Sequence, residues 1–224
     1  MAAADSCQPI CLTDELTGSN CYILSADNCV LIIDPNNFSV IQHLLAAHHW
    51  QPDLIFLTHE HCDHIAGLNE LRQVYETPVL ASRACSDGMG NVTSNMSRIM
   101  ETYLYFKSGG TTLIHYPRFT CSPADCVFDG PYEFTWHDHV FQAIPVPGHT
   151  VGSVCLIMDR KQLFSGDYFV PGEEVITRLP GGDSQAYEKT GKKVLQSLPV
   201  PIHTYPGHYA DFILTEEVKR NYGL

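Results

Sequence analysis

Short apolar runs separated by turn residues form the main hydrophobic pattern of this 224-residue chain. Two such runs, 21–26 and 29–34, are joined at Asp27-Asn28 and predict a β-hairpin. The second half of the chain repeats the pattern, with a predicted hairpin turn at His137-Asp138. Further strands are predicted at 54–57, 79–81, 132–136, 140–146, 154–158, 162–165 and 202–205.

Apolar residues recur three or four positions apart in other stretches, which is the spacing of an amphipathic helix. The predicted helices are 38–50, 67–75, 91–107, 184–197 and 215–221. Ser184 is the expected N-cap of the fourth helix, and the sequence from Thr215 to Val218 approaches a capping box at the last. Residues 111–127 follow neither period, so we expect a loop insertion there.

The order of these elements indicates the fold class. Strands occur towards both ends of the chain, and helices are interspersed between them. This order favours two packed sheets with helices on the outside over a parallel doubly wound sheet. We therefore expect an α+β protein, a four-layer αββα sandwich, formed by a single domain over residues 1–224.

Composition narrows the range of partners. The chain is 44% hydrophobic and 17% charged, as in an ordinary globular protein. Its formal net charge of −12 argues against a nucleic-acid partner and, more weakly, against an anionic membrane surface. We expect a small-molecule substrate and either a monomer or a homodimer.

Cysteine usage and the first residues bear on the compartment. The nine cysteines are odd in number and scattered, which favours reduced thiols over a disulfide framework. The pairs Cys7/Cys11 and Cys121/Cys126 lack the two-residue spacing of a zinc knuckle. We expect no signal peptide, since residues 1–6 carry no positive charge or long apolar stretch, and no run approaches the roughly 20 apolar residues of a membrane span. The expected location is the cytoplasm.

The segment LTHEHCDHIAG, residues 57–67, concentrates metal-binding side chains directly after a predicted strand. Within six positions it contains His59, His61, Asp63 and His64. Such a density of lone-pair donors indicates either a crowded polar loop or a site for more than one metal ion.

Three further strand ends favour the metal site. Each finishes in a donor preceded by glycine: His149, Asp167 and His208. The glycine allows a sharp turn, so that the side chain projects into a cleft instead of the core. Imidazoles with a few carboxylates suit Zn²⁺ and, less exclusively, Fe or Mn.

This pattern resembles the metallo-β-lactamase superfamily and, within it, the hydroxyacylglutathione hydrolase (glyoxalase II)-like group. The resemblance also rests on NCYIL (20–24), IDP (33–35), PGHTVGSV (147–154), RLPGGD (178–183) and YPGH (205–208), which stand in that group's order. It implies that one metal ion is bound by His59, His61 and His149. A second would be bound by Asp63, His64 and His208, with Asp167 bridging both.

The resemblance also implies a reaction. Two cations can share a water and lower its pKa to about 7, so that a bridging hydroxide attacks the substrate. Asp63 would both bind a metal ion and orient this nucleophile. The leading hypothesis is a binuclear hydrolase of a thioester, lactone or related ester. Only sixteen residues follow His208, which argues against glutathione thioesters and leaves smaller thioesters open.

Two other functions stay open. A mononuclear-iron sulfur dioxygenase uses a related scaffold, and one iron ion per chain with oxygen uptake would favour it. A non-catalytic sensor on the same fold would bind two metal ions without turning over any ester.

The remaining polar residues have weaker interpretations. Glu60 is expected to support the site or face solvent, and Cys62 to be a packed thiol facing away. His137 and His139 imitate metal spacing but fall at a hairpin, which favours a surface turn. Arg178 and Asp183 are expected to order a loop. Substrate choice is assigned to residues 91–127, the least patterned stretch beside the predicted site.

Overall fold

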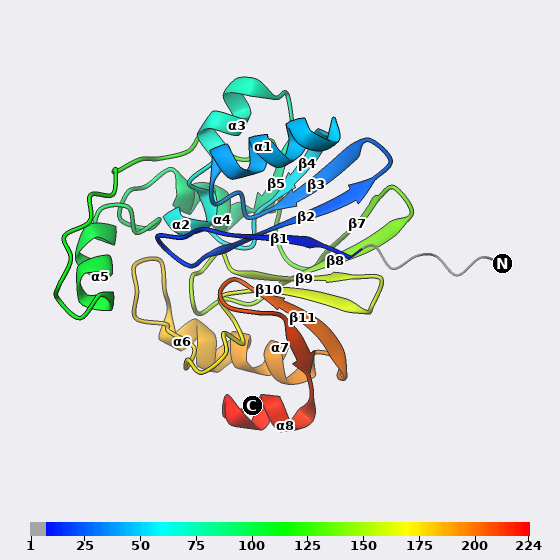
Figure 1. Ribbon diagram of the computed structural model, residues 1–224. Helices are drawn as coiled ribbons and strands as arrows, with labels where there is room; N and C mark the ends of the chain where they lie inside the picture. Colours follow the sequence, from blue (N-terminus) through cyan, green and yellow to red (C-terminus); the bar gives the residue numbers. More distant parts are fainter. Residues whose placement is uncertain (1–7) are drawn as a thin grey trace.

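The computed structural model describes residues 8–224 and arranges them in four layers (Figure 1). Two six-stranded sheets pack face to face, with orders β1-β2-β3-β4-β5-β6 and β12-β11-β10-β9-β8-β7. Helices cover the outer face of each sheet. The predicted α+β sandwich is therefore confirmed.

The first sheet consists of the edge strand β1, the predicted hairpin of β2 and β3, and three further strands that continue in parallel. Its strands are β1 (Ile10–Thr13), β2 (Asn20–Ala26), β3 (Cys29–Ile33), β4 (Gln51–Phe56), β5 (Val79–Ser82) and β6 (Cys126–Phe128). The pairs from β3 to β6 are all parallel, so their carboxyl ends meet at one edge. The connections carry α1 (Phe38–His48), α3 (Leu68–Val74), α4 (Arg83–Met89) and α5 (Met100–Lys107).

The second sheet is antiparallel except for one pair. Its strands are β7 (Tyr132–Trp136), β8 (His139–Pro145), β9 (Val154–Met158), β10 (Gln162–Gly166), β11 (Ile202–Pro206) and β12 (Phe212–Leu214). Strands β10 and β11 are parallel, which again places two carboxyl ends side by side. The helical segments of this half are α6 (Ser184–Ala186), the π-helical turn η1 (Tyr187–Gly191), α7 (Lys192–Ser197) and α8 (Glu216–Asn221).

The central strands are buried on both faces. In β2, Cys21 and Ile23 pack in the cluster that includes Ile41 and Leu45 of α1. The alternate residues, such as Leu24, belong to the cluster between the sheets. Because both faces are covered, these strands read as continuous apolar runs and not as alternating ones.

Several short elements were not predicted. They are β1, β6, β12, α4 and α2 (Cys62–Ile65). Each spans only three to seven residues, too few to establish a period. Strand β6 also ends the predicted loop 111–127, which is otherwise irregular from residue 111 to residue 124.

Two predicted helices were wrong in part. The helix expected over 91–107 is confined to α5, because Met96 has a left-handed φ of +65° and interrupts the preceding turns. The helix expected over 184–197 is divided by η1. Its N-cap is Asp183 and not Ser184, since the Asp183 carboxylate accepts a hydrogen bond from the Ala186 amide (2.9 Å).

The cap of the last helix is confirmed at Thr215, whose side chain accepts a hydrogen bond from the Val218 amide (3.2 Å). Valine at that position cannot return the bond, so only half of a capping box forms. Among residues 8–224, no helix combines the length and the apolar character that a membrane crossing requires.

Candidate metal centre

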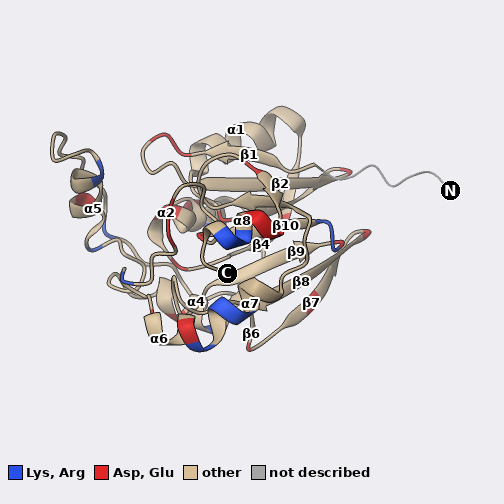
Figure 2. Ribbon diagram, turned by 90° about the horizontal axis from the view of Figure 1, so that it is seen from below, with Lys and Arg blue, Asp and Glu red and all other residues tan. Residues whose placement is uncertain are grey.

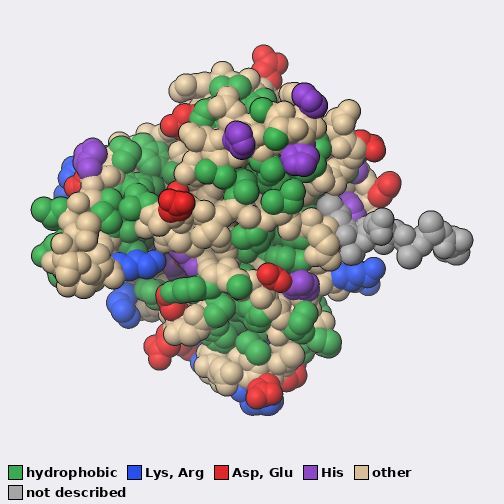
Figure 3. Space-filling model, viewed as in Figure 1, with side chains coloured by type: hydrophobic (Ala, Val, Ile, Leu, Met, Phe, Trp, Pro, Cys, Tyr) green, Lys and Arg blue, Asp and Glu red, His purple; other side chains and the backbone are tan. Residues whose placement is uncertain are grey.

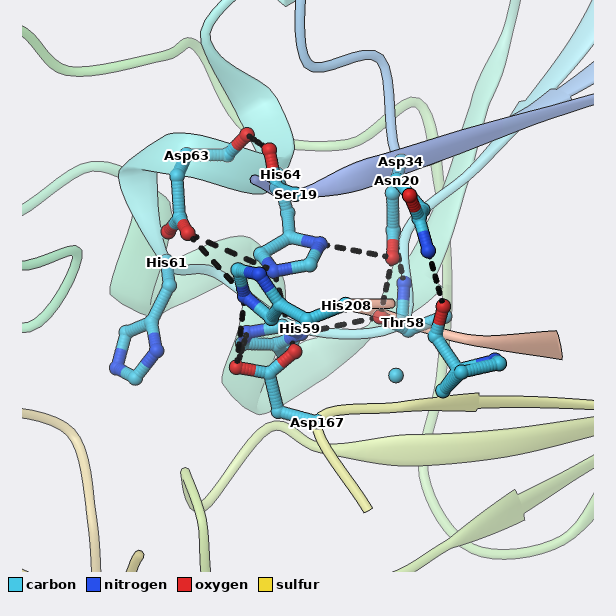
Figure 4. A network of polar contacts seen from close by, with 12 residues as sticks. Ser19, Asn20, Asp34, Thr58, His59, His61, Asp63, His64, Asp167 and His208 are labelled. Atoms are coloured by element: carbon cyan, nitrogen blue, oxygen red, sulfur yellow. Dashed lines mark hydrogen bonds and ion pairs between the residues drawn. The ribbon is translucent and has the colours of Figure 1, made fainter. Parts of the chain in front are cut away.

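The carboxyl ends of four strands deliver the seven predicted donors. The segment after β4 carries four of them and passes through α2, while His149, Asp167 and His208 follow β8, β10 and β11. The structure brings all seven together in two adjoining groups, and six of them are labelled in Figure 4. The groups are His59, His61, His149 and Asp167, and then Asp63, His64 and His208.

Glycines make this convergence possible. Gly166, before Asp167, has a φ of +53°, in the left-handed region that favours glycine. A Cβ atom on Gly207 would overlap the Asp167 carboxylate, so a side chain there would displace a donor of the site. The sequence-based interpretation of the glycines as turn residues is confirmed at Gly166, whereas Gly207 is required for a close approach.

In the first group, His61 and His149 face each other, and their hydrogen bonds to backbone carbonyls fix which ring nitrogen of each carries the proton. His61 Nε2 lies 2.9 Å from the Pro180 carbonyl oxygen, and His149 Nδ1 lies 2.9 Å from that of Ile176. A carbonyl only accepts, so both ring nitrogens carry the proton. The opposite atoms, His61 Nδ1 and His149 Nε2, then present lone pairs to each other at 3.0 Å. Two nitrogens on one tetrahedral zinc ion stand about 3.3 Å apart.

A buried aspartate directs the third histidine of this group. The Thr58 amide and hydroxyl both donate to the Asp34 carboxylate, at 2.7 and 2.6 Å. With its hydrogen used in this way, the Thr58 oxygen accepts from His59 Nδ1 at 3.0 Å. His59 Nε2 is therefore a lone-pair donor as well. Asp34 also lies 3.3 Å from His64 Nδ1 (Figure 4).

The second group gathers around two carboxylates. Asp63 Oδ2 lies 3.8 Å from His64 Nε2 and 3.6 Å from His208 Nε2. Asp167 reaches both groups: its Oδ1 lies 3.2 Å from His64 Nε2, and its Oδ2 lies 3.3 Å from His149 Nε2. The Asp167 carboxylate thus stands between the two sets of imidazoles.

The first hairpin fastens the loops that carry these donors. The Ser19 hydroxyl donates to the Asp63 carbonyl at 2.8 Å. The Asn20 side-chain amide donates to the carbonyls of Pro206 and Tyr209, at 3.0 and 2.7 Å, on either side of His208. These contacts hold α2 and the turn after β11 against one strand.

The charges of the site favour neutral imidazoles in the first group. Burial lowers the pKa of His59 well below its ordinary value and lowers the pKa of His61 to about 4. Burial also lowers the pKa of His208, but Asp167 outweighs it and raises the pKa overall. Burial raises the pKa of Asp167, yet His208 and His64 outweigh it, so the carboxyl pKa is well below its ordinary value. The ionised Asp167 is the negative centre of the site.

Unpartnered atoms test whether a metal fits. Among residues 8–224, His59 Nε2, His64 Nε2 and Asp167 Oδ1 are buried and have no hydrogen-bond partner. Buried polar atoms are rarely left in this state, because each costs roughly 1–3 kcal/mol. The atoms point into the two groups of donors, and nitrogen and oxygen ligands of this kind fit divalent metal ions.

Glu60 is buried, so of the two roles expected for it, facing solvent is wrong and support of the site fits the structure. Its Oε2 accepts a hydrogen bond from the Thr150 hydroxyl at 2.8 Å, and burial raises the pKa of Glu60 to about 7. Gly88, Gly152 and Gly181 each approach its side chain closely. Glu60 thus connects the histidine segment with the loop of His149 and supports the site from behind.

The other residues singled out in the sequence lie outside the two groups. Cys62 is buried against Met96, Met100 and Leu104, as a packed thiol. Asp183 orders its loop as the N-cap of α6, whereas Arg178 is exposed. His137 lies in the predicted β7–β8 turn, and His139 pairs with Asp159 at 2.6 Å.

The cysteine pairs form no site within residues 8–224. The eight cysteines of that range are free thiols. Cys121 is buried while Cys126 is exposed, and Cys7 lies outside the described residues. Sequence reasoning missed Asp34, Thr58 and Ser19, although Asp34 stands in the IDP motif of the resemblance.

A pocket opens over the metal centre beside α5 (Figure 3). His149, Asp167 and His208 form one part of its wall, and Tyr103 and Lys107 of α5 form another. The segment 169–179 closes the remaining side. The centre is therefore reachable by a small molecule.

Comparison with solved structures supports the same fold. The B3 metallo-β-lactamase BLEG-1 is 24% identical, with 92% of this chain and 94% of that chain covered and a TM-score of 0.73. TTHA1623, solved in a di-iron-bound form, is 24% identical over the same shares with a TM-score of 0.69. ETHE1 from Myxococcus xanthus is 21% identical over 96% of this chain and 85% of that chain, with a TM-score of 0.70.

A family model identifies the chain from its sequence. The model described as the metallo-beta-lactamase superfamily matches residues 14–208, a range that contains all seven donors. Together with the fold and the two groups of histidines and aspartates, this match establishes that the chain belongs to the metallo-β-lactamase superfamily.

Proposed function

We propose that this chain is a binuclear metal-dependent hydrolase that cleaves a thioester, lactone or related ester of a small molecule. His59, His61 and His149 would bind one metal ion, Asp63, His64 and His208 the second, and Asp167 both. The observation that carries this proposal is the 3.0 Å approach of two lone pairs, on His61 Nδ1 and His149 Nε2. Only a cation or a shared proton relieves such an approach, and burial opposes protonation of His61.

Ligand chemistry favours zinc, with iron or manganese as the other candidates. When bound, two such cations lower the pKa of a shared water to about 7 and polarise the substrate's carbonyl oxygen. The chain's own contribution is orientation. Asp63 would accept a hydrogen bond from the nucleophile; its carboxylate lies 3.6 Å from His208 Nε2, and the Ser19 hydroxyl donates to its backbone carbonyl.

The segment 91–127 supplies residues to the pocket, in support of its proposed part in substrate choice. Lys107 Nζ donates to the Thr17 carbonyl at 3.3 Å and lies 5.8 Å above the centre of the Tyr103 ring. Lys107 is the one Lys or Arg among the residues that line this pocket. We propose that the Lys107 ammonium group binds an anionic group of the substrate, such as a carboxylate.

A small-molecule substrate fits the charge distribution. Lys and Arg residues are dispersed over α5, α7 and α8 and do not gather on one face (Figure 2). Nucleic-acid binding requires a clustered basic surface. The free thiols of residues 8–224 fit the proposed cytoplasmic location.

Metal removal is expected to destabilise the protein, because it restores the lone-pair contact and the unpartnered buried atoms. A metal ion present at about 100 times its dissociation constant adds roughly 2.7 kcal/mol to the free energy of unfolding. For a chain of this size, the melting temperature should fall by about 5 °C or more after dialysis against a chelator. Thermal unfolding measured before and after re-addition of zinc checks this; an unchanged melting temperature would count against the site.

Asp167→Asn is expected to weaken the binding of both metal ions together, because the Asp167 carboxylate stands between the two groups of donors. Elemental analysis should fall from about two metal ions per chain to less than one. Asp138→Asn, at the β7–β8 turn, is the matched control and should keep two. Retention of both ions in the Asp167 variant would contradict the bridging role.

Hydrolysis itself is tested with protein purified without added metal. Elemental analysis should give two ions per chain, and a panel of thioesters, lactones and phosphodiesters should reveal ester cleavage. Asp63→Asn at saturating metal should lower kcat by about 100-fold or more if the carboxylate orients the nucleophile. One iron ion per chain together with oxygen uptake would contradict the hydrolase and favour the sulfur dioxygenase. Two bound metal ions without turnover of any ester would instead indicate a non-catalytic sensor.

The assignment of Lys107 makes a separate prediction. Lys107→Gln should raise KM about 10-fold for esters that carry a carboxylate and leave kcat little changed, because it removes a binding contact remote from the reacting atoms. Neutral esters should be unaffected. Lys192→Gln is the control, since Lys192 lines a different pocket. Equal effects on charged and neutral esters would rule out an ionic contact.

A further inference from the structure

A second type of donor cluster lies at the opposite end of the first sheet. In the first sheet, the donors of the metal centre follow the carboxyl end of β4, whereas Cys29 begins β3 and Asp53 lies near the start of β4. The parallel register places Cys29 beside Gln51 and Val30 beside Pro52. His137, from the β7–β8 turn of the other sheet, completes the cluster.

The three side chains differ in donor atom and converge closely. A thiol, a carboxylate and an imidazole each present one ligand atom, and all three atoms lie within 4.8 Å of one another. His137 Nε2 stands 3.3 Å from Asp53 Oδ2. The two atoms are within hydrogen-bonding distance in the absence of a metal ion, and the same separation is about the spacing of two light ligands on one tetrahedral zinc ion.

The carboxylate of the cluster is held in place by a buried side chain. Trp136 Nε1 donates to Asp53 Oδ1 at 2.8 Å, and Trp136 is only 5% exposed. This bond occupies one oxygen and leaves Oδ2 towards His137. Hydrogen bonds of this kind orient carboxylate ligands in known metal sites.

Negative charge gathers around the thiol. Desolvation and the Asp53 carboxylate raise the pKa of Cys29, and Asp27 adds to the effect. A cation would reverse this effect by stabilising the thiolate. The side chains of Asp53 and His137 are 37% and 33% exposed, so an ion can reach them from solvent.

We propose that Cys29, Asp53 and His137 bind a third divalent metal ion of the zinc type, with water in the fourth position. Mixed sulfur, nitrogen and oxygen donors in tetrahedral arrangement suit zinc. Because His137 belongs to the second sheet and the other two donors to the first, the ion fastens the two sheets at the end remote from the metal centre. This proposal does not depend on the hydrolase assignment.

A second histidine–carboxylate pair, close in sequence to His137, has no cysteine beside it and can be compared with the proposed site. His139 and Asp159 lie 2.6 Å apart in the β8 region and belong to none of the candidate metal groups within residues 8–224. They are an ordinary histidine–carboxylate ion pair. The pair therefore supplies a matched control for substitutions of His137.

Cobalt substitution tests the site with a signal that the main centre cannot give. Thiolate bound to Co²⁺ produces a charge-transfer band in the near ultraviolet, and the seven donors of the main centre include no cysteine. Titration of the chelated full-length chain with Co²⁺ should produce this band. Zinc analysis after reconstitution with excess zinc should give three ions per chain, one more than the two expected in protein purified without added metal.

Variants decide whether the band comes from this cluster. Cys29→Ser and His137→Ala should each abolish it and reduce bound zinc from three to two, whereas Cys62→Ser and His139→Ala should leave both readings unchanged. Circular dichroism establishes that each variant is folded. The proposal is overturned if no band appears, if the band survives in Cys29→Ser, or if zinc binding stays at two in the wild type.

Discussion

The candidate metal centre depends on hydrogen bonds made outside it. The carbonyls of Pro180 and Ile176 accept from the outward nitrogens of His61 and His149, and Thr58 accepts from His59. A ring nitrogen that must donate outward leaves an unprotonated nitrogen inward. Three such lone pairs meet beside an ionised carboxylate, an arrangement that strongly favours a cation.

The fold explains why these atoms can meet. Parallel pairing of β3 with β4 places Asp34 beside the histidine segment, and parallel pairing of β10 with β11 places Asp167 beside His208. The two sheets pack face to face, so those edges bring the donors into two adjoining groups. Strands buried on both faces supply a rigid frame, and a glycine at each tight approach, such as Gly207, lets the loops come together.

The convergence of the seven candidate donors could be predicted from the sequence because their chemistry is local. Histidines and aspartates after apolar strands can be recognised one segment at a time, and the resemblance to a family supplied their grouping. The layered fold followed from the order of strands and helices. The structure brings all seven donors together, as expected.

What the sequence did not reveal depends on contacts across the fold. Asp34 ends the predicted strand 29–34, and its hydrogen bonds to Thr58 appear only when β3 and β4 are paired. Glu60 reads as a polar loop residue until Thr150 is packed against it. The break at Met96 is a backbone conformation that apolar spacing cannot encode.

Anomalous diffraction from crystals of the metal-loaded chain tests the central claim most directly. The account predicts two peaks on either side of the Asp167 carboxylate. One should lie among His59, His61 and His149, and the other among Asp63, His64 and His208. A single peak, or peaks that avoid these nitrogens, would contradict the binuclear centre on which the proposed hydrolysis depends.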